Sequence, residues 1–154
     1  MTMKKISVNI LLLILIDQIS KILVSMWIPY KQEITIIPTL LNFTYIKNTG
    51  AAFSLLEGKQ TLFIIITILV LIFGFFLIYK KKLTKQEIII YSLIGGGIIG
   101  NLIDRIIYKS VIDFISITIF NYHFAIFNLA DTFIVIGVLL YIIFIGKEEL
   151  KCKK

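Results

Sequence analysis

The sequence predicts a mainly α-helical membrane protein with four transmembrane helices, a small extracytoplasmic sheet and a short interfacial helix. The 154-residue chain is 58% hydrophobic and only 16% charged, and its mean hydropathy is +0.97. A soluble domain of this size has too small a core to bury so much apolar surface. Lysines gather near the ends of apolar segments, as expected at membrane boundaries. We therefore expect one integral membrane domain over residues 1–154.

The first predicted helix covers residues 6–28, about the 20 residues that span a bilayer. It follows the basic start Met1–Lys5 and continues to Trp27, a residue type that favours the membrane interface. The opening resembles a secretory signal peptide, but no small-residue cleavage site closes the apolar run. We expect the segment to remain as a transmembrane helix.

Residues 29–58 are polar and aromatic, and Pro and Gly break them into pieces too short to span. The runs 34–37 and 40–46 are rich in β-branched and aromatic residues, which predicts strands of a small sheet on the membrane. Residues 51–56 (AAFSLL) follow a turn signal at Asn48–Gly50 and are expected to form the short interfacial helix.

The remaining helices are predicted over residues 61–79, 87–107 and 128–145. Gly96 and Gly100 in the third have a spacing that lets another helix approach closely. Between the third and fourth helices, the run VIDFISITIF (111–120) is again β-prone.

The basic residues predict the orientation. Ten of the 16 lie in the N-terminus, the loop between the second and third helices, and the tail. With four spans, these segments and both termini are cytoplasmic, and the loops that hold Asn48 and Asp113 are outside. The net charge of +7 is then a topology signal rather than a nucleic-acid footprint, so no nucleic-acid partner is expected. Cys152, the single cysteine, is expected to be a reduced cytoplasmic thiol.

Asp113 and Asp131 are candidate catalytic residues, because both lie where apolar segments end, close to a membrane surface. Two adjacent carboxylates do not easily ionise together, so one keeps a proton while the other acts as a general base on water. The protonated one can donate to a carbonyl oxygen. Alternatively the two are separate: Asp113 solvated in a loop, Asp131 favouring the dipole of the fourth helix.

Asn101, Asp104 and Arg105 lie three and four residues apart and share a face of the third helix. For Asp104 we expect a structural role. Arg105 could equally support the site or bind a substrate carboxylate or phosphate. Asp17 and Lys21, at i and i+4 on the first helix, form an intrahelical pair or face the site.

Asn48 and Asn128 flank turns, where a turn former and a helix N-cap are sufficient explanations. Near a carboxylate pair, their amides could also hold a substrate backbone. His123 is the single histidine, and HExxH and GxSxG are absent, so neither a zinc site nor a serine triad is supported. We expect no metal and no organic cofactor.

Five motifs, in this order, resemble the lipoprotein signal peptidase (signal peptidase II) family: DQISK (17–21), NTGAAFS (48–54), GNLIDR (100–105), VIDF (111–114) and FNLAD (127–131). The resemblance implies an aspartic endopeptidase of the bacterial inner membrane, with Asp113 and Asp131 as its catalytic dyad. Asn48, Asn101, Arg105 and Asn128 would line the site, and Asp17, Lys21 and Asp104 would support it. The predicted strands would form the family's outer β-cradle.

The same resemblance implies the substrate: a prolipoprotein whose cysteine bears diacylglycerol, cut just before that cysteine near the outer leaflet. Membrane lipids and globomycin-type peptide inhibitors are the other implied partners. Two rival functions remain on sequence alone. Membrane carboxylates also mark proton- or cation-coupled carriers, and the GxxxG spacing could serve a non-catalytic assembly subunit.

Overall fold

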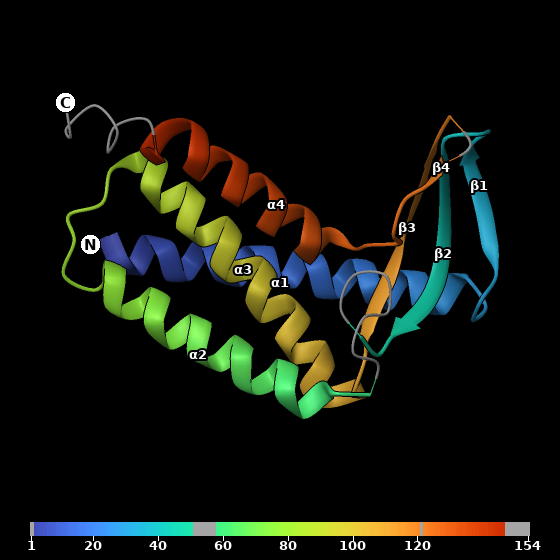
Figure 1. The fold of residues 1–154 in the computed structure, drawn as a ribbon, viewed down its shortest axis with the longest axis horizontal. Coiled ribbons are helices and arrows are strands. Elements are labelled where there is room, and N and C mark those ends of the chain that lie inside the picture. Colours follow the sequence, from blue (N-terminus) through green and yellow to red (C-terminus); the bar gives the residue numbers. More distant parts are fainter. Residues whose placement is uncertain (1, 51–57, 121, 147–154) are drawn as a thin grey trace.

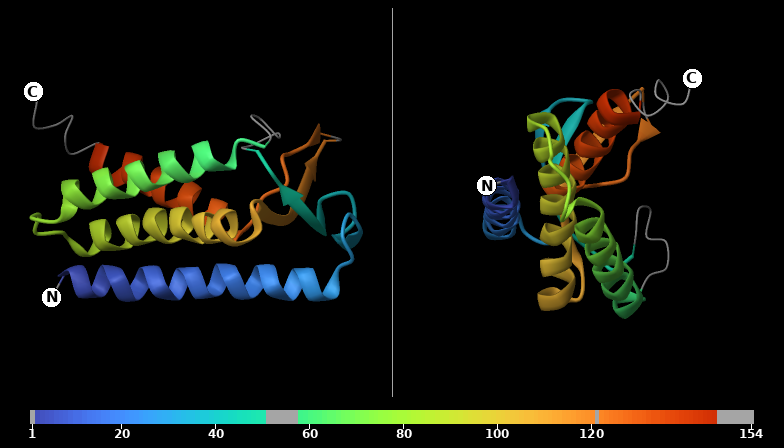
Figure 2. Two further views of the ribbon diagram at one scale, coloured as in Figure 1. Left: turned by 90° about the horizontal axis from the view of Figure 1, so that it is seen from below. Right: turned by 90° about the vertical axis from the view of Figure 1, so that its left-hand side faces the viewer.

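A computed structural model describes residues 2–50, 58–120 and 122–146. It contains a bundle of four helices with a small antiparallel sheet at one end (Figure 1). The N-terminus and the connection between the second and third helices lie at the opposite end (Figure 2). The expected interfacial helix over residues 51–56 and the predicted thiol Cys152 fall outside the described residues.

Three helices are long and apolar enough to cross a membrane: α1 (Thr2–Trp27), α2 (Gln60–Ile78) and α3 (Lys85–Tyr108). The fourth, α4 (Leu129–Tyr141), is shorter and is followed by a π-helical segment, η2 (Ile142–Gly146). The most apolar window of α2 has no buried residue. A helix that is apolar all round and unburied needs lipid as its solvent. The fold is thus that of a membrane protein with three clear spans, and a fourth span remains a prediction.

α3 is the helix against which the other three pack. A Cβ atom at Gly96 would lie 2.8 Å from the Leu13 side chain, and one at Gly100 would lie 2.6 Å from Asp17 Oδ2. These glycines therefore let α1 approach α3 closely, as their spacing predicts. Gly97 likewise lets α4 approach α3 closely, because a Cβ at Gly97 would collide with the backbone of Ala130.

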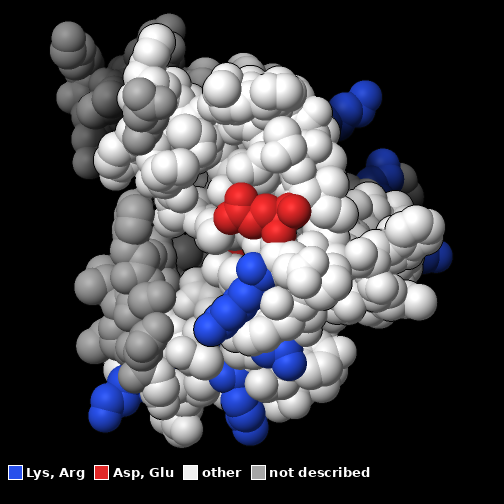
Figure 3. Space-filling model, turned by 90° about the vertical axis from the view of Figure 1, so that its right-hand side faces the viewer, with Lys and Arg blue, Asp and Glu red and all other residues white. Residues whose placement is uncertain are grey.

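The sheet has the order β1 (Glu33–Ile37), β2 (Leu41–Asn48), β3 (Val111–Ile119) and β4 (Tyr122–His123), each pair antiparallel. The three β-prone runs of the sequence correspond to β1, β2 and β3. Ladder irregularities interrupt both β1–β2 and β2–β3 pairing, and such bulges bend a sheet. The face at this end of the molecule shows an acidic group near its centre and several basic side chains, on an otherwise uncharged surface (Figure 3).

β3 also fixes the start of α4. The Phe127 carbonyl accepts the N–H groups of Phe114 and Ile115 at 3.0 and 2.8 Å, and Phe127 N–H donates to Ile115. Asn128 then begins α4 as its N-cap, in a reciprocal capping box with Asp131. These local bonds place two residues that are 18 positions apart, Asp113 and Asp131, at one end of the bundle.

Candidate active site

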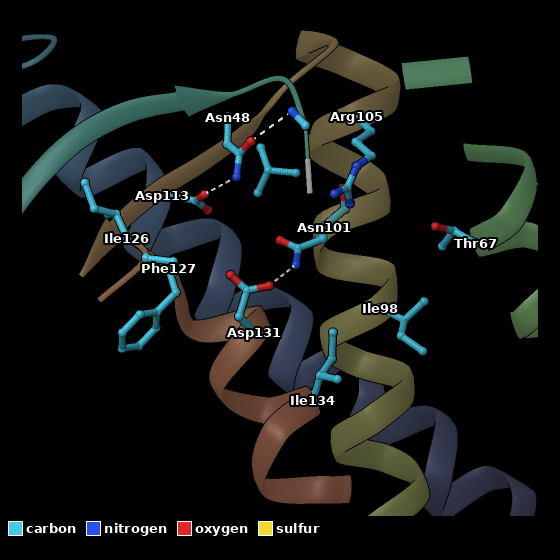
Figure 4. Close-up of a pocket in the computed structure, with 13 residues that line it drawn as sticks. Asn48, Thr67, Ile98, Asn101, Arg105, Asp113, Ile126, Phe127, Asp131 and Ile134 are labelled. Atoms are coloured by element: carbon cyan, nitrogen blue, oxygen red, sulfur yellow. Dashed lines mark hydrogen bonds between the residues drawn. The ribbon is translucent and has the colours of Figure 1, made fainter. Parts of the chain in front are cut away.

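A cavity of 390 Å³ lies where the sheet meets the helices (Figure 4). Its polar wall comes from β2, α2, α3, β3 and α4 and includes both candidate aspartates. The polar wall residues singled out in the sequence are Asn48, Asn101, Arg105, Asp113 and Asp131. Apolar side chains such as Ile98, Phe127 and Ile134 complete the wall, so a polar site opens within mainly apolar surroundings.

Asp113 is buried in β3 with 2% of its surface exposed. One carboxylate oxygen accepts from Asn48 Nδ2 at 2.9 Å, and the other accepts from Asn128 Nδ2 at 2.7 Å. Burial raises the pKa of the Asp113 carboxyl from 3.8 to about 7, and the charge of Asp131 acts in the same direction against these amide bonds. Near neutral pH, Asp113 is therefore poised to hold or release a proton.

Asp131 lies in the first turn of α4, half-buried on the same cavity. Its carboxylate accepts from Asn101 Nδ2 at 2.7 Å and from the N–H of Asn128 at 3.2 Å. Asp113 and Asp131 therefore line one cavity. Asp113 is not a solvated loop residue, whereas Asp131 does lie in the first turn of the fourth helix, as the alternative expected. Among the described residues, no Lys or Arg forms a salt bridge with either of them.

Asn101 connects this pair to the interior of the bundle. Its Oδ1 accepts from Lys21 Nζ at 3.0 Å and from Asn128 Nδ2 at 3.2 Å. A lysine ammonium can only donate, so the oxygen of the Asn101 amide must face Lys21. The NH2 group then faces Asp131, so the bond from Lys21 fixes the orientation of the amide that donates to Asp131.

Behind Asn101, a fully buried ion cluster joins α1 to α3. Lys21 Nζ lies 2.8 Å from Asp17 and 3.0 Å from Asp104, and each of the three side chains is 1% exposed or less. The intrahelical pair predicted for Asp17 and Lys21 is therefore present, with Asp104 as a second partner. Asp17 also accepts the N–H of Ala130 in α4, and Asp104 accepts that of Ile112 in β3. The cluster thus connects α1 and α3 to α4 and β3, the two elements that carry Asp131 and Asp113.

Arg105 points into the cavity from α3, its guanidinium carbon 5.3 Å from the centre of the Phe63 ring. It donates weakly to the Asn101 carbonyl at 3.5 Å, while its buried Nε has no hydrogen-bond partner among the described residues. Asp104 forms its salt bridge with Lys21 of α1 and not with Arg105, its neighbour on α3. Arg105 thus lines the cavity and forms no salt bridge with a described carboxylate.

The structure brings the predicted site residues into two connected groups. Asn48, Asn128 and Asn101 contact the aspartates directly, and Asp17, Lys21 and Asp104 stand behind them. Asn128 also serves as N-cap, and Asn48 accepts the Gly50 N–H as a turn former, so the structural role expected for each is present. His123 is exposed on β4, away from the cavity lining.

Gln18 also belongs to this network and was not predicted from the sequence as a site residue. Its amide donates to Asp104 at 2.9 Å and to the Gly100 carbonyl at 3.2 Å, which ties α1 to α3 beside the ion cluster. A polar residue three positions before Lys21 in an otherwise apolar helix shares its face, and that spacing could have identified it. Within the described ranges, no group of three His, Cys, Asp or Glu residues could hold a metal ion.

This fold and cavity define an integral membrane protein with a carboxylate pair in a buried polar site. Residues 9–147 match the family model described as Signal peptidase (SPase) II, and the chain therefore belongs to the signal peptidase II family. It is a peptidase of a bacterial membrane, and the carrier alternative has no support.

Named relatives agree with this assignment. A lipoprotein signal peptidase of Halothermothrix orenii is 39% identical over 140 residues, which cover 91% of this chain and 94% of that protein. One from Staphylococcus aureus is 40% identical over 88% of this chain and 83% of its own length. Among solved structures, a bacterial membrane enzyme at 2.3 Å resolution superposes with a TM-score of 0.86 and 36% identity, over 94% of this chain and 88% of that one.

Proposed function

We propose that this peptidase is an aspartic endopeptidase in which Asp113 and Asp131 form the catalytic dyad. As a signal peptidase II, it removes signal peptides from prolipoproteins. The observation that carries the aspartic assignment is the pair itself: two carboxylates on one cavity, each held by amide donors, with the pKa of Asp113 raised to about 7. Such a pair can hold one proton between two acids at neutral pH.

Asp131 is the general base and Asp113 the general acid. Asp113 is the more buried of the two, so it is the costlier site for a negative charge. Asp131 removes a proton from water, and the water oxygen attacks the scissile carbonyl carbon while Asp113 protonates the carbonyl oxygen. Asp131 then transfers its proton to the leaving nitrogen as the C–N bond breaks, and the diol hydroxyl returns a proton to Asp113.

The remaining site residues position the dyad and the substrate. Asn48, Asn101 and Asn128 hold the two carboxylates, and Arg105, which lines the cavity, binds substrate oxygen atoms. Asp17, Lys21 and Asp104 support the site from behind. A globomycin-type peptide inhibitor would occupy the same cavity.

The membrane arrangement is also proposed. α4 with η2 is a fourth span, both termini are cytoplasmic, and the cavity lies near the outer leaflet. The lysines at the end of the bundle opposite the sheet favour this orientation. The substrate is then a prolipoprotein whose diacylglyceryl cysteine is anchored in that leaflet, and cleavage falls just before this cysteine.

Purified protein in detergent, incubated with a diacylglyceryl-modified prolipoprotein, tests this function. Asp113→Asn and Asp131→Asn are each expected to lower the cleavage rate by about 100-fold or more, since each removes one proton-transfer group. Glu33→Gln is the matched control, because it removes an exposed carboxylate of β1. Wild-type rates in both dyad variants would contradict the aspartic mechanism. Mass spectrometry of the products gives the cleavage position.

A further inference from the structure

A basic groove lies at the end of the bundle opposite the sheet, far from the catalytic cavity. The groove has a volume of 460 Å³ and lies between the first turns of α1 and α3. Lys4 and Lys5 of α1 and Lys85 of α3 line it, above an apolar floor that includes Val8 and Ile88. Charged groups from two helices thus converge on one groove.

The wall of this groove is basic. Among the described residues, those that line it include no Asp or Glu. Glu87 lies nearby in the sequence, where its carboxylate accepts the Thr84 N–H at 2.8 Å in the capping box of α3. The three lysine ammonium groups therefore favour an anionic ligand.

The basic groove continues into an apolar one. A second groove of 230 Å³ follows the same two helices toward the middle of the bundle, and Asn9 and Ile89 line both grooves. Its other walls include Leu12, Leu13 and Leu93. Lys4 and Leu13 are nine residues apart, so the combined groove extends about 13 Å along α1.

We propose that this combined groove binds one anionic phospholipid. The lysines hold its phosphate, and one acyl chain lies along the apolar part between α1 and α3. A charged end that leads into an apolar channel matches this ligand, whereas free phosphate would leave the apolar part unused. This site does not depend on the proposed catalytic mechanism.

The simplest alternative is that these lysines act only through their overall positive charge. The chain offers a matched control, because Lys80, Lys81 and Lys82 lie at the same end of the molecule but line none of this groove. Replacing either set of three lysines by glutamine removes the same charge. All six side chains are exposed, so neither variant disturbs the core.

The test is native mass spectrometry of the full-length protein in a non-ionic detergent. The probes are phosphatidylglycerol, phosphatidylcholine with the same acyl chains, and inorganic phosphate. We expect one bound phosphatidylglycerol, held at least about tenfold more tightly than phosphatidylcholine. This affinity falls at least about tenfold in the variant Lys4→Gln/Lys5→Gln/Lys85→Gln and stays unchanged in Lys80→Gln/Lys81→Gln/Lys82→Gln.

A second pair of variants tests the apolar part without changing charge. Ile89→Trp fills the channel and is expected to weaken phosphatidylglycerol binding, whereas Ile65→Trp, at an equally exposed position of α2, is not. Equal weakening by both lysine variants, or equal affinity for phosphatidylcholine, would overturn the proposal. Displacement of the lipid by inorganic phosphate, or no effect of Ile89→Trp, would overturn the acyl-chain site.

Discussion

Two pairs of carboxylates lie on opposite sides of Asn101, and they differ in their donors. Asp17 and Asp104 share the ammonium group of Lys21, and all three side chains are almost fully buried. Asp113 and Asp131 instead accept from neutral amides and a backbone N–H, and they border a cavity. One pair of aspartates is thus bound to a buried cation, and the other is bound to neutral donors.

The difference separates a structural cluster from the pair that is proposed to be catalytic. A buried cation fixes the charge and position of its partners, so the first pair holds helices together. Neutral amide donors position a carboxylate without supplying a compensating charge. Asp113, whose pKa burial raises to about 7, can therefore exchange a proton near neutral pH, as acid–base catalysis needs.

Lys21→Met should break the structural cluster and have the largest effect on stability. It leaves Asp17 and Asp104 buried without their cation, and breaking such a pair costs about 3–5 kcal/mol of unfolding free energy. Thermal unfolding in detergent measures this loss. Lys47→Met, at an exposed position of β2, is the control and should unfold like the wild type. Equal unfolding temperatures for Lys21→Met and the wild type would refute the structural role.

Asp113 of the proposed catalytic pair should make stability depend on pH. The pKa of Asp113 is raised from 3.8 to about 7 in the folded protein, so between these values the folded state binds more protons than the unfolded state. The destabilising contribution is absent below pH 4 and complete above pH 7, and it amounts to a few kcal/mol. Unfolding followed from pH 4 to pH 8 should show stability falling across this window. Asp113→Asn should flatten the fall, and an unchanged slope in that variant would assign it to another group.

Gly100→Ala should damage the contact that keeps the two pairs adjacent. The new Cβ would lie 2.6 Å from Asp17 Oδ2, and crowding of this kind costs about 1–3 kcal/mol. Gly74→Ala in α2 is the matched control, since no atom lies within 4 Å of its added Cβ. The control should be neutral or slightly stabilising, because Ala favours a helix. If both variants unfold alike, the close approach of α1 and α3 is not critical.

Asn48→Ala should have the smallest effect on stability, and among the two cavity aspartates it removes a donor from Asp113 only. Its amide bond at 2.9 Å lowers the pKa of Asp113, so its removal should raise that pKa further. We expect a stability loss of about 1 kcal/mol and a shift of the falling limb of the pH–rate profile to higher pH. Asn42→Ala, which loses a bond to exposed Glu33, should leave the limb in place. A shift to lower pH would contradict the proposed donor role.

Local patterns predicted much of the fold. Apolar length located α1, α2 and α3, the β-prone runs located β1 to β3, and the spacing of Gly96 and Gly100 predicted close helix packing. These features depend on neighbours in the sequence. The intrahelical partner of Lys21 could be read for the same reason.

Contacts between distant segments could not be read in this way. Asp104 as the second partner of Lys21, and the bond from Asp17 to the Ala130 N–H, arise from how α1, α3, α4 and β3 pack together. Spacing alone left Asp113 and Asp131 as a pair or as separate residues. Their placement on one cavity depends on the bridge between β3 and Phe127, which no local pattern encodes.

The pH dependence of kcat/KM for prolipoprotein cleavage tests the central claim most directly, that Asp113 and Asp131 share a catalytic proton. This quantity reports the ionisation of essential groups in the free enzyme. We expect a bell-shaped profile whose falling limb lies near pH 7, where Asp113 loses its proton. A value of kcat/KM that stays constant from about pH 5 to pH 9 would contradict the account, since no shared proton would then be needed.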